Sequence, residues 1–422
     1  MPFSASSSGR LLTAAMTSNP SCDICVVGTG PAGLAAALAL ARMGLRVAAI
    51  GPGPDARDTR TAALFAGSVT LLENLGLGPA CHKIGQPIYA IRVLDDMGGL
   101  LRAPEVTFTA AEVGLERFGF NLPNVALVAA LRARAGEIDS LEMIEGSVTQ
   151  VRVLENAAEV QLSGGRTLHA RLIIGADGRR SLCRTAAAIA VRTWDYEQSA
   201  LACTFTHKRP HNGISTEFHR RTGPLTTVPS PGLSSSLVWV ERPETAAQLA
   251  GLDEGAFRKT LEERLQGLLG DISDIGPRAV FPLTGLSAEV AGRNRVALVG
   301  EAVHVIPPIG AQGLNLGLRD AACIADCVAD AAAIGGDIGA PGVLQAYDRM
   351  RRPDISARIW SIDLLNRSLL THAAPVQALR GLGLHLLKSV GPVRRLAIRE
   401  GLHPSLISPR LMQPAGSGAG ST

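Results

Sequence analysis

The stretch CDICVVGTGPAGLAAALALARMGLRVAAI, from Cys22 to Ile50, decides the fold of this 422-residue chain. Its apolar run Ile24–Val27 predicts a buried parallel strand. The Ala- and Leu-rich run that follows predicts a helix that ends at Gly44. A second strand is expected over Arg46–Ile50. Together these elements predict a strand–helix–strand unit, which is the opening of an α/β fold.

The turn between the first strand and the helix has the spacing G-x-G-x-x-G. The first glycine permits a tight turn, the second lets the main chain approach a pyrophosphate, and the third allows close packing of helix and strand. Unpaired N–H groups and the positive end of the helix then favour an anion. We therefore expect a nucleotide cofactor to bind at Gly28, Gly30, Pro31, Ala32 and Gly33. The alternative is a glycine-rich turn without a ligand.

The end of the second strand departs from the usual dinucleotide site. An acid that binds the adenosine ribose usually stands there, whereas this chain has Gly51 and only later Asp55. Asp55 and main-chain groups are the two alternatives for ribose binding. The first loop therefore does not distinguish NAD from FAD.

Composition narrows the class of protein. The chain has 46% hydrophobic residues, 18% charged residues, 46 glycines and a net charge of +4, which indicates a globular, turn-rich α/β protein. We expect no nucleic-acid partner, because the charge is small and no basic run with interleaved aromatics occurs. Seven scattered cysteines favour reduced core thiols over disulfides or a zinc site.

The C-terminal part of the chain has the pattern of apolar and basic residues that bears on membrane contact. No uninterrupted run of about 18 apolar residues occurs, so we expect no membrane span and a cytoplasmic protein. Residues 374–402 place Leu, Val and Ile at helical intervals among the basic residues Arg380, Lys388, Arg394, Arg395 and Arg399. The alternatives are a helix that lies on the inner face of a membrane and a core helix with a basic outer face.

Two distant segments also follow buried strands and turn sharply. The segment GADGRRSLCR places Asp177 and Gly178 just after the run Leu172–Gly175. The segment GEAVHVIPPIGAQGLNLGLRDA places Gly300 and Glu301 after another strand, before a Pro/Gly loop and a helix.

These three segments, in this order, resemble the fingerprints of the single-component FAD-dependent aromatic hydroxylases, the class A flavin monooxygenases. The fingerprints are an N-terminal GxGxxG, a D-G pair in the middle of the sequence and a late G-D-x-x-H-x-x-x-P. The segment DTRTAALFAGSVTLLENLGL, Asp58–Leu77, further resembles the D-x-R-x-x-A-L segment of the ubiquinone-biosynthesis hydroxylases. The resemblance covers residues 22–400 in round figures. One departure is Glu301, one methylene longer than the usual Asp that binds the ribityl group.

The resemblance implies an FAD-binding Rossmann-like domain of the para-hydroxybenzoate hydroxylase type, an inserted antiparallel substrate domain and a C-terminal helical region. Alternating runs over 141–171 predict an antiparallel meander, and 190–285 a β-rich layer with one helix near Glu254–Leu269. We expect the FAD-binding domain at 22–84, 106–188 and 286–345 and the substrate domain at 85–105 and 189–285. C-terminal helices are expected at 346–412. For residues 1–21 the alternatives are a disordered extension and a transit peptide, and 413–422 is expected to be a disordered tail.

The resemblance also implies which residues contact FAD. In addition to the first glycine turn, it assigns cofactor binding to Arg60, Asp177, Gly178, Gly300, Glu301, Gly313, Leu314 and Asn315. Pro308, Gly310 and Gln312 form the environment of the reacting flavin ring, and no acid/base residue is assigned. His304 is expected to support its loop rather than to transfer a proton. No metal site is expected.

By resemblance, NAD(P)H reduces FAD, O₂ adds to the flavin at C4a, and the resulting hydroperoxide delivers one oxygen to an electron-rich phenol ring. The expected substrate is a polyprenylated phenol of ubiquinone biosynthesis, and other proteins of that pathway are candidate partners. Three alternatives stay open: a hydroxylase of a soluble aromatic compound, a flavin-dependent reductase of isoprenoid chains, and a non-catalytic scaffold subunit of a ubiquinone-biosynthesis complex.

Overall fold

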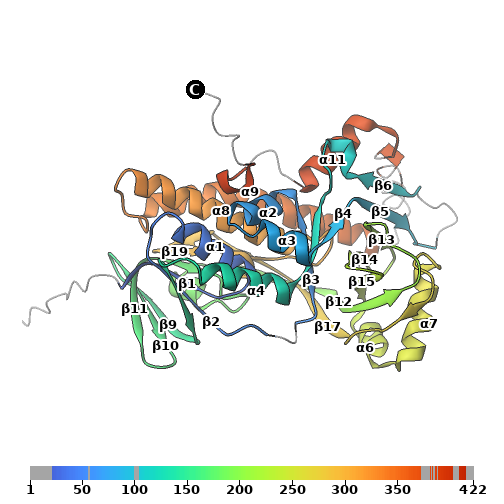
Figure 1. The fold of residues 1–422 in the computed structure, drawn as a ribbon, viewed down its shortest axis with the longest axis horizontal. Helices are drawn as coiled ribbons and strands as arrows, with labels where there is room; N and C mark the ends of the chain where they lie inside the picture. Colours follow the sequence, from blue (N-terminus) through green and yellow to red (C-terminus); the bar gives the residue numbers. More distant parts are fainter. Residues whose placement is uncertain are drawn as a thin grey trace, which may run out of the picture.

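The computed structural model describes residues 21–55, 58–98, 104–371, 381, 383, 385–386, 388–402 and 408–414. Within these ranges the strands form three sheets, with helices packed over them (Figure 1). This arrangement confirms the mixed α/β class. The expected extension 1–21, apart from Ser21, and the tail beyond Pro414 lie outside the described residues.

The first sheet, called the parallel sheet below, contains the strand–helix–strand unit. Its strand order is β18 (Gly292–Arg293), β19 (Val296–Leu298), β11 (Thr167–Gly175), β1 (Cys22–Val27), β2 (Val47–Gly51) and β8 (Leu141–Glu145), with β10 (Ala158–Leu162) and β9 (Val148–Val153) beside β11. Strands β19, β11, β1, β2 and β8 run parallel. Strands β9, β10 and β11 form the expected antiparallel meander.

The expectation for 141–171 was wrong at its first strand. β8 does not join the meander but pairs in parallel with β2, with Leu141 opposite Val47. The reason is that β8 follows the helix α4 (Asn124–Ala135), and a strand that returns through a helical crossover enters the sheet in parallel.

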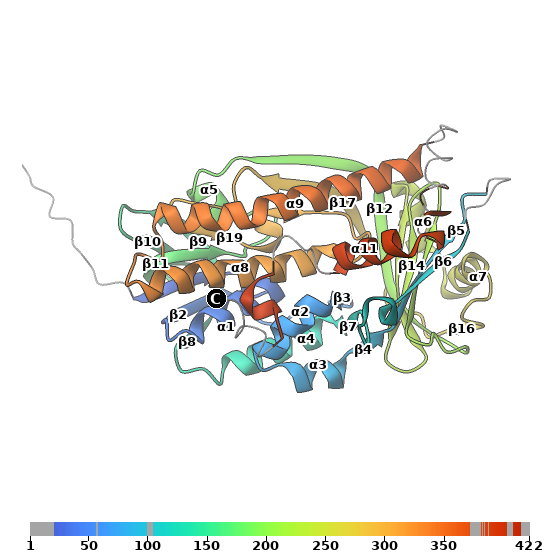
Figure 2. The same cartoon turned by 90° about the horizontal axis from the view of Figure 1, so that it is seen from above.

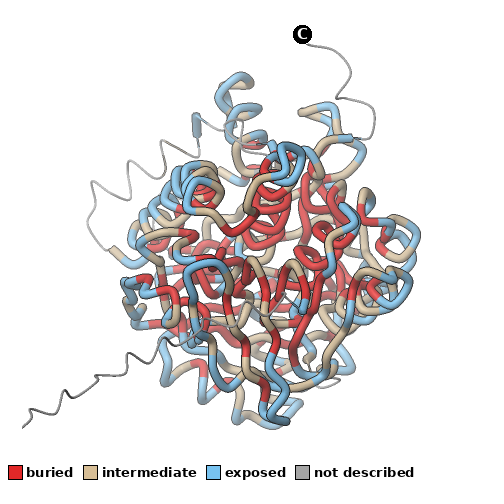
Figure 3. The backbone as a smooth tube through the Cα atoms, turned by 90° about the vertical axis from the view of Figure 1, so that its left-hand side faces the viewer, coloured by how far each residue is buried: buried red, intermediate tan, exposed pale blue. Residues whose placement is uncertain are grey.

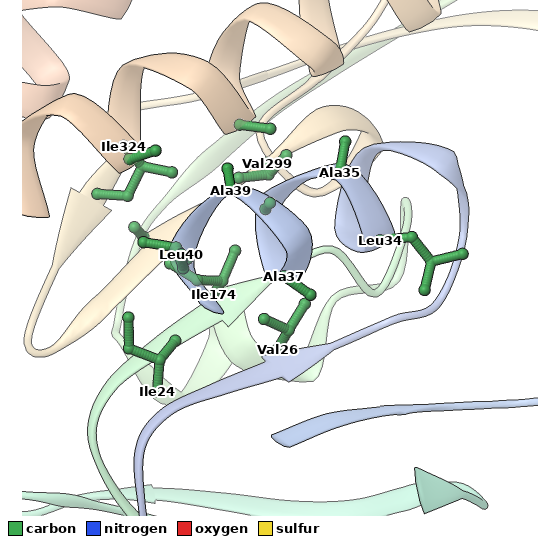
Figure 4. Packing of buried hydrophobic residues seen from close by; sticks show 14 of the residues in the cluster. Ile24, Val26, Leu34, Ala35, Ala37, Ala39, Leu40, Ile174, Val299 and Ile324 are labelled. Atoms are coloured by element: carbon green, nitrogen blue, oxygen red, sulfur yellow. The ribbon is translucent and has the colours of Figure 1, made fainter. Parts of the chain in front are cut away.

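Helix α1 (Pro31–Ala41) lies in the centre of the larger core. All of its residues from Gly33 onward are buried, because it packs on the parallel sheet and against α4 and α8 (Gln312–Ala333). Figure 4 shows Ala37 and Leu40 of α1 above Val26 and Ile24 of β1. Small side chains along α1 allow this close approach of helix and sheet.

The second sheet, called the broad sheet below, lies beside the parallel sheet, on the right in Figure 1. Its strand order is β20 (His304–Val305), β17 (Ala279–Ala288), β12 (Val191–His207), β15 (Ser234–Glu241), β14 (Leu225–Ser230), β13 (Ile214–His219), β5 (Ala90–Asp95) and β6 (Val106–Thr109), with β16 (Ile272–Ser273) beside β12. It is antiparallel except for the pair of β13 with β5.

Two helices cover the outer face of the broad sheet. α7 (Glu254–Leu265) is the expected helix, whereas α6 (Pro243–Gly251) was not expected. A second hydrophobic core forms between these helices and the sheet, with Phe218, Trp239 and Phe257 buried in it. The opposite face of the sheet is therefore free to line a cavity.

A small sheet joins the two halves of the molecule. It contains β3 (Thr61–Phe65), β7 (Gly119–Pro123) and β4 (Gln86–Ile88), and is flanked by α2 (Ala66–Asn74) and α3 (Gly78–Ile84). Shorter elements are η1 (Ala110–Val113), α5 (Leu182–Ala186), η2 (Gly300–Ala302) and η3 (Arg410–Met412). Figure 3 shows the buried segments gathered in the middle of the molecule.

Two C-terminal helices lie across the molecule. In Figure 2, α9 (Pro341–Leu370) runs from beside the parallel sheet toward the broad sheet. It packs on β18 and β19 near its start, and its Asn366 Nδ2 donates to Gln198 Oε1 of β12 at 2.7 Å. α11 (Gly391–Leu402) lies near η1. α9 crosses the expected domain boundary at 345/346. Strand β6, which pairs with β5 of the broad sheet, begins directly after the expected boundary at 105/106.

Candidate active site

A cavity of about 770 Å³ lies between the turns of the parallel sheet and the inner face of the broad sheet. One side is formed by Gly30–Gly33, Gly178, Gly300 and Glu301. The opposite side is formed by residues of the broad sheet, among them Ala200, Thr226, Val238, Phe281 and Leu283. Ile88 and Ile91, from the range 85–105 that we expected in the substrate domain, also line the cavity.

The first glycine turn brings the start of α1 to this cavity. Gly28 has φ +112°, and a Cβ there would lie 2.2 Å from the carbonyl oxygen of Ala176. A Cβ on Gly33 would lie 2.0 Å from the carbonyl oxygen of Gly28, whereas one on Gly30 would meet no atom within 4 Å. Gly28 and Gly33 are thus required by packing, and Gly30 leaves open space for a ligand.

The start of α8 is the second helix end at the cavity. Gly310 has φ +65° and Ala311, the N-cap, has φ +53°. Neither α1 nor α8 has a side-chain cap or an acidic residue in its first turn. Pro308, Gly310, Gly313 and Leu314 line the cavity at this point. Two helix N-termini with free N–H groups therefore present positive potential to one space.

An ion pair joins the two later turns at the edge of the cavity. Arg179 Nε donates to Glu301 Oε2 at 3.1 Å, and Arg179 Nη1 donates to Thr284 Oγ1 of β17 at 3.1 Å. Behind this pair, the buried Arg184 donates to the carbonyl oxygens of Ala302 and Arg179, both at 2.8 Å. Arg184 thus fixes the two turns relative to each other.

Arg60 lines the cavity on the side of the small sheet. Its Nε and Nη2 donate to Asp58 at 2.7 and 2.8 Å, and its guanidinium lies 6.0 Å from the ring centroid of Phe281. Burial raises the pKa of Asp58, but the hydrogen bonds from Arg60 outweigh burial, so that its pKa lies below the ordinary value. Asp58 therefore stays ionised and orients Arg60.

Four expected site residues do not line the cavity. Gly28 packs beneath it, as described above. Asp177 accepts hydrogen bonds from Ser181 Oγ and the Cys183 N–H, which places its carboxylate at the start of α5. Gln312 Nε2 donates to the carbonyl oxygens of Gly310 and Gly401.

Asn315 is the fourth, and its side chain is buried. Its Oδ1 accepts hydrogen bonds from the Phe65 N–H at 2.9 Å and Ser68 Oγ at 2.8 Å, while Nδ2 donates to the carbonyl oxygens of Ala63 and Ala311. Asn315 therefore fixes the start of α8 against β3 and α2. Its side chain supports the cavity wall rather than facing a ligand.

The missing ribose acid has a structural reason. A Cβ on Gly51, at the end of β2, would lie 2.2 Å from Thr29 Oγ1 and 2.7 Å from the Thr29 N–H nitrogen. Thr29 Oγ1 itself donates to the carbonyl oxygen of Pro52 at 3.0 Å. The threonine therefore occupies the space that an acidic side chain at position 51 would need.

Motif reasoning missed the polar residues that enter the cavity from the small and broad sheets. Thr61 Oγ1 donates to Ser236 Oγ at 2.9 Å, and Asn121 Nδ2 donates to the carbonyl oxygen of Pro229 at 2.9 Å. The side chains that line the cavity here are Thr61, Asn121, Ser236 and Glu217. Alternation along each strand indicated which residues share one face of the sheet. It did not indicate which of the two faces lines the cavity.

The residues present fit FAD. Gly30, Gly178, Gly310 and Gly313 line the cavity, and a Cβ on any of them would project into open space. The two uncapped helix ends suit a pyrophosphate and an electron-accepting ring. The fold and the site thus define a flavin-dependent monooxygenase, a class of enzyme that takes its electrons from NAD(P)H.

The chain belongs to the family described as FAD binding domain, whose model matches residues 21–359. It is 35% identical over 401 residues to the ubiquinone hydroxylase UbiL of Rhodospirillum rubrum, covering 93% of this chain and 92% of UbiL. It is 30% identical to the 3-demethoxyubiquinol 3-hydroxylase of Escherichia coli, covering 92% and 100%. The solved structure of Pseudomonas aeruginosa PqsL shares the fold, with a TM-score of 0.73, 23% identity and coverage of 86% and 99%.

Proposed function

We propose that this chain hydroxylates the aromatic ring of a polyprenylated phenol in ubiquinone biosynthesis, with FAD, NAD(P)H and O₂. One observation carries the proposal: a single cavity is lined by glycine turns on one side and by mostly apolar strand residues on the other. This arrangement suits a flavin next to an apolar ring. The relatives named as ubiquinone hydroxylases support the substrate class.

Bound FAD supplies the electron transfer from NAD(P)H and the activation of O₂. In our proposal, Gly30, Pro31 and Ala32 bind its pyrophosphate through the start of α1. Gly178, Gly300 and Glu301 contact its middle portion, with Arg60 nearby. The backbone N–H groups at Gly313 and Leu314 stabilise negative charge on the ring.

Pro308 and Gly310 would line the part of the cavity that holds the flavin ring in this proposal. Gly28, Asp177, Gln312 and Asn315 act indirectly, because their contacts fix the turns. The broad sheet with β4 would form the substrate domain, and the parallel sheet the FAD-binding domain. The apolar inner face of the broad sheet excludes water from the reacting ring.

The purified protein tests this function directly. We expect it to retain flavin absorbance and to convert a prenylated phenol into a product with one added oxygen, with NAD(P)H consumed. Hydroxylation of unprenylated aromatics alone would favour a soluble substrate, and reduction of the prenyl double bond would favour an isoprenoid reductase. A colourless protein that does not bind added FAD would favour a scaffold subunit.

We also propose that the C-terminal helices contact a membrane surface. No helix in the described part of the chain has the length and apolarity to span a bilayer. Large apolar side chains are nevertheless exposed on α9 and α11: Trp360 by 68%, Leu364 by 52% and Leu396 by 61%. The basic side chains Arg395 and Arg399 are exposed nearby on α11, whereas Arg380 lies outside the described residues. Such a surface suits an anionic lipid interface.

This surface is next to the cavity. Ile398, on the buried side of α11, packs in one cluster with the cavity-lining residues Phe65 and Ile88. Arg394 Nη2 donates to Glu112 Oε1 of η1 at 2.8 Å, which fastens the helix over this cluster. α11 thus lies between the exposed apolar surface and the cavity, where a prenyl tail would enter.

Vesicle sedimentation tests the membrane contact. We expect the protein to sediment with vesicles rich in phosphatidylglycerol, and the double variant Trp360→Ser/Leu396→Ser to remain in the supernatant. Ile334→Ser is the matched control, since Ile334 is 84% exposed at the end of α8 and is not part of α9 or α11. Equal sedimentation of the double variant and the control would contradict the proposed surface.

A further inference from the structure

Glu217 is the carboxylate that the broad sheet contributes to the cavity lining, among the residues that the structure describes. It lies on β13, where Ser215 and Glu217 face the cavity and Thr216 and Phe218 face away. Glu217 is paired across the sheet with Thr226 of β14, which also lines the cavity. The side chain of Glu217 is only 12% exposed.

The surroundings of Glu217 make a charge there costly. The same face of the sheet supplies Ala200, Val228 and Val238, together with small hydroxyl side chains. A carboxylate in such a place needs hydrogen-bond donors to compensate for lost water. The charged residues Arg60, Arg179 and Glu301 belong to the turns and the small sheet instead.

One donor is provided by the protein itself. His219, two residues further on the same face of β13, lies with Nε2 2.8 Å from Glu217 Oε1, and its side chain is 6% exposed. His219 Nδ1 is buried without a hydrogen-bond partner in the described structure. Because a carboxylate oxygen accepts, this contact requires a proton on His219 Nε2.

One carboxylate oxygen of Glu217 therefore lacks a hydrogen-bond donor. His219 donates to Oε1, and Oε2 of Glu217 accepts no hydrogen bond from any described residue. The pair thus presents an acceptor to whatever molecule occupies the cavity.

We propose that Glu217 binds the phenolic hydroxyl of the substrate and excludes phenols that carry a ring carboxylate. This inference rests on the proposed ring hydroxylation and adds a substrate class, an uncharged phenol. A hydroxyl donating to the carboxylate both orients the ring and increases its electron density. A substrate carboxylate in the same space would meet a like charge with little water to screen it. His219 is the positioning residue that holds the acceptor.

Ligand titration of the FAD-loaded protein tests this without turnover. The two probes are ortho-prenylphenol and the same compound with a carboxylate para to the hydroxyl, and the readout is the change in flavin absorbance. We expect the wild-type protein to bind the uncharged phenol about 100-fold more tightly. In Glu217→Gln, affinity for the phenol should fall about tenfold, and the preference over the acid should largely disappear.

Glu241→Gln is the matched control, because Glu241 is a buried acid on β15 of the same sheet that does not line the cavity. It should leave the preference unchanged, and Glu217→Asp, which keeps the charge, should retain most of it. Equal binding of both probes by the wild-type protein would overturn the inference, whatever the variants do. If the wild-type protein binds no FAD or hydroxylates no phenol, that result would instead contradict the proposed function.

Discussion

Asp320 Oδ2 lies 2.7 Å from His304 Nε2, and both side chains are buried. The same oxygen accepts the Gly300 N–H at 3.0 Å, while Asp320 Oδ1 accepts Arg351 Nε of α9 at 2.7 Å. One carboxylate of α8 thus fixes the Gly300–Glu301 turn and joins it to α9. This geometry supports the interpretation of His304 as a residue that holds its loop.

Asp320→Asn should destabilise the fold strongly. The change removes the charge that Asp320 places beside the fully buried Arg351, which then has Asp354 as its remaining carboxylate partner, and it replaces one of the two acceptor oxygens by an NH₂ group. Loss of one partner from a buried ion pair costs about 3–5 kcal/mol, and we expect this decrease in the free energy of unfolding by chemical denaturation. Asp330→Asn is the control, since the pair of Asp330 with Arg410 is exposed and should contribute less than about 1 kcal/mol. Equal losses in both variants would show that Asp320 is not a central support.

The same carboxylate should give a defined acid dependence. Burial raises the pKa of Asp320, but the charges of His304 and Arg351 outweigh it and lower the pKa from 3.8 to about 2. A lowered pKa stabilises the folded state above the unfolded value, so this contribution is complete above about pH 4 and is lost between about pH 4 and 2. Unfolding measured across this range should show a steeper loss in the wild-type protein than in Asp320→Asn. Parallel curves would assign the acid dependence to other groups.

The sequence predicted the parts of the site that local backbone geometry decides. Gly28 and Gly33 stand where a Cβ would meet a carbonyl oxygen, so the G-x-G-x-x-G spacing carried its own structural reason. The strand–helix–strand unit and the start of α8 followed from the same local signals. The buried positions of all seven cysteines confirm their interpretation as core thiols.

Contacts between distant segments could not be predicted in this way. Glu217 and Asn121 lie on strands whose alternation is clear, but the facing partner is set by the packing of three sheets. The role of Gly51 depends on Thr29, which is distant in sequence and adjacent in space. Asn315 was expected at the flavin, yet its amide is used by β3 and α2. Where a residue points at the start of a helix depends on the neighbouring segments, which the motif does not encode.

Gly30→Ala and Gly33→Ala should separate ligand binding from folding. A Cβ at position 30 meets no atom within 4 Å and projects toward the cavity, so this variant should keep its stability and bind FAD about tenfold more weakly. A Cβ at position 33 meets the Gly28 carbonyl oxygen at 2.0 Å, so that variant should unfold at lower denaturant concentration. FAD titration and urea unfolding of both proteins provide the measurements. A stable Gly33→Ala protein with normal FAD affinity would refute the assigned packing.

Arg394→Ala should make the reaction less efficient without removing it. Arg394 fastens α11 to η1 through Glu112, and its hydrogen bonds lower the pKa of Glu112 to about 2, so this ion pair is charged at neutral pH. Without it, α11 should separate more often from the cluster around Ile398, and water should reach the reacting ring. We expect the ratio of hydroxylated product to NAD(P)H consumed to fall about twofold. Arg395→Ala is the matched control, because its side chain is exposed on the same helix. An unchanged ratio in Arg394→Ala would mean that α11 does not cover the reacting ring.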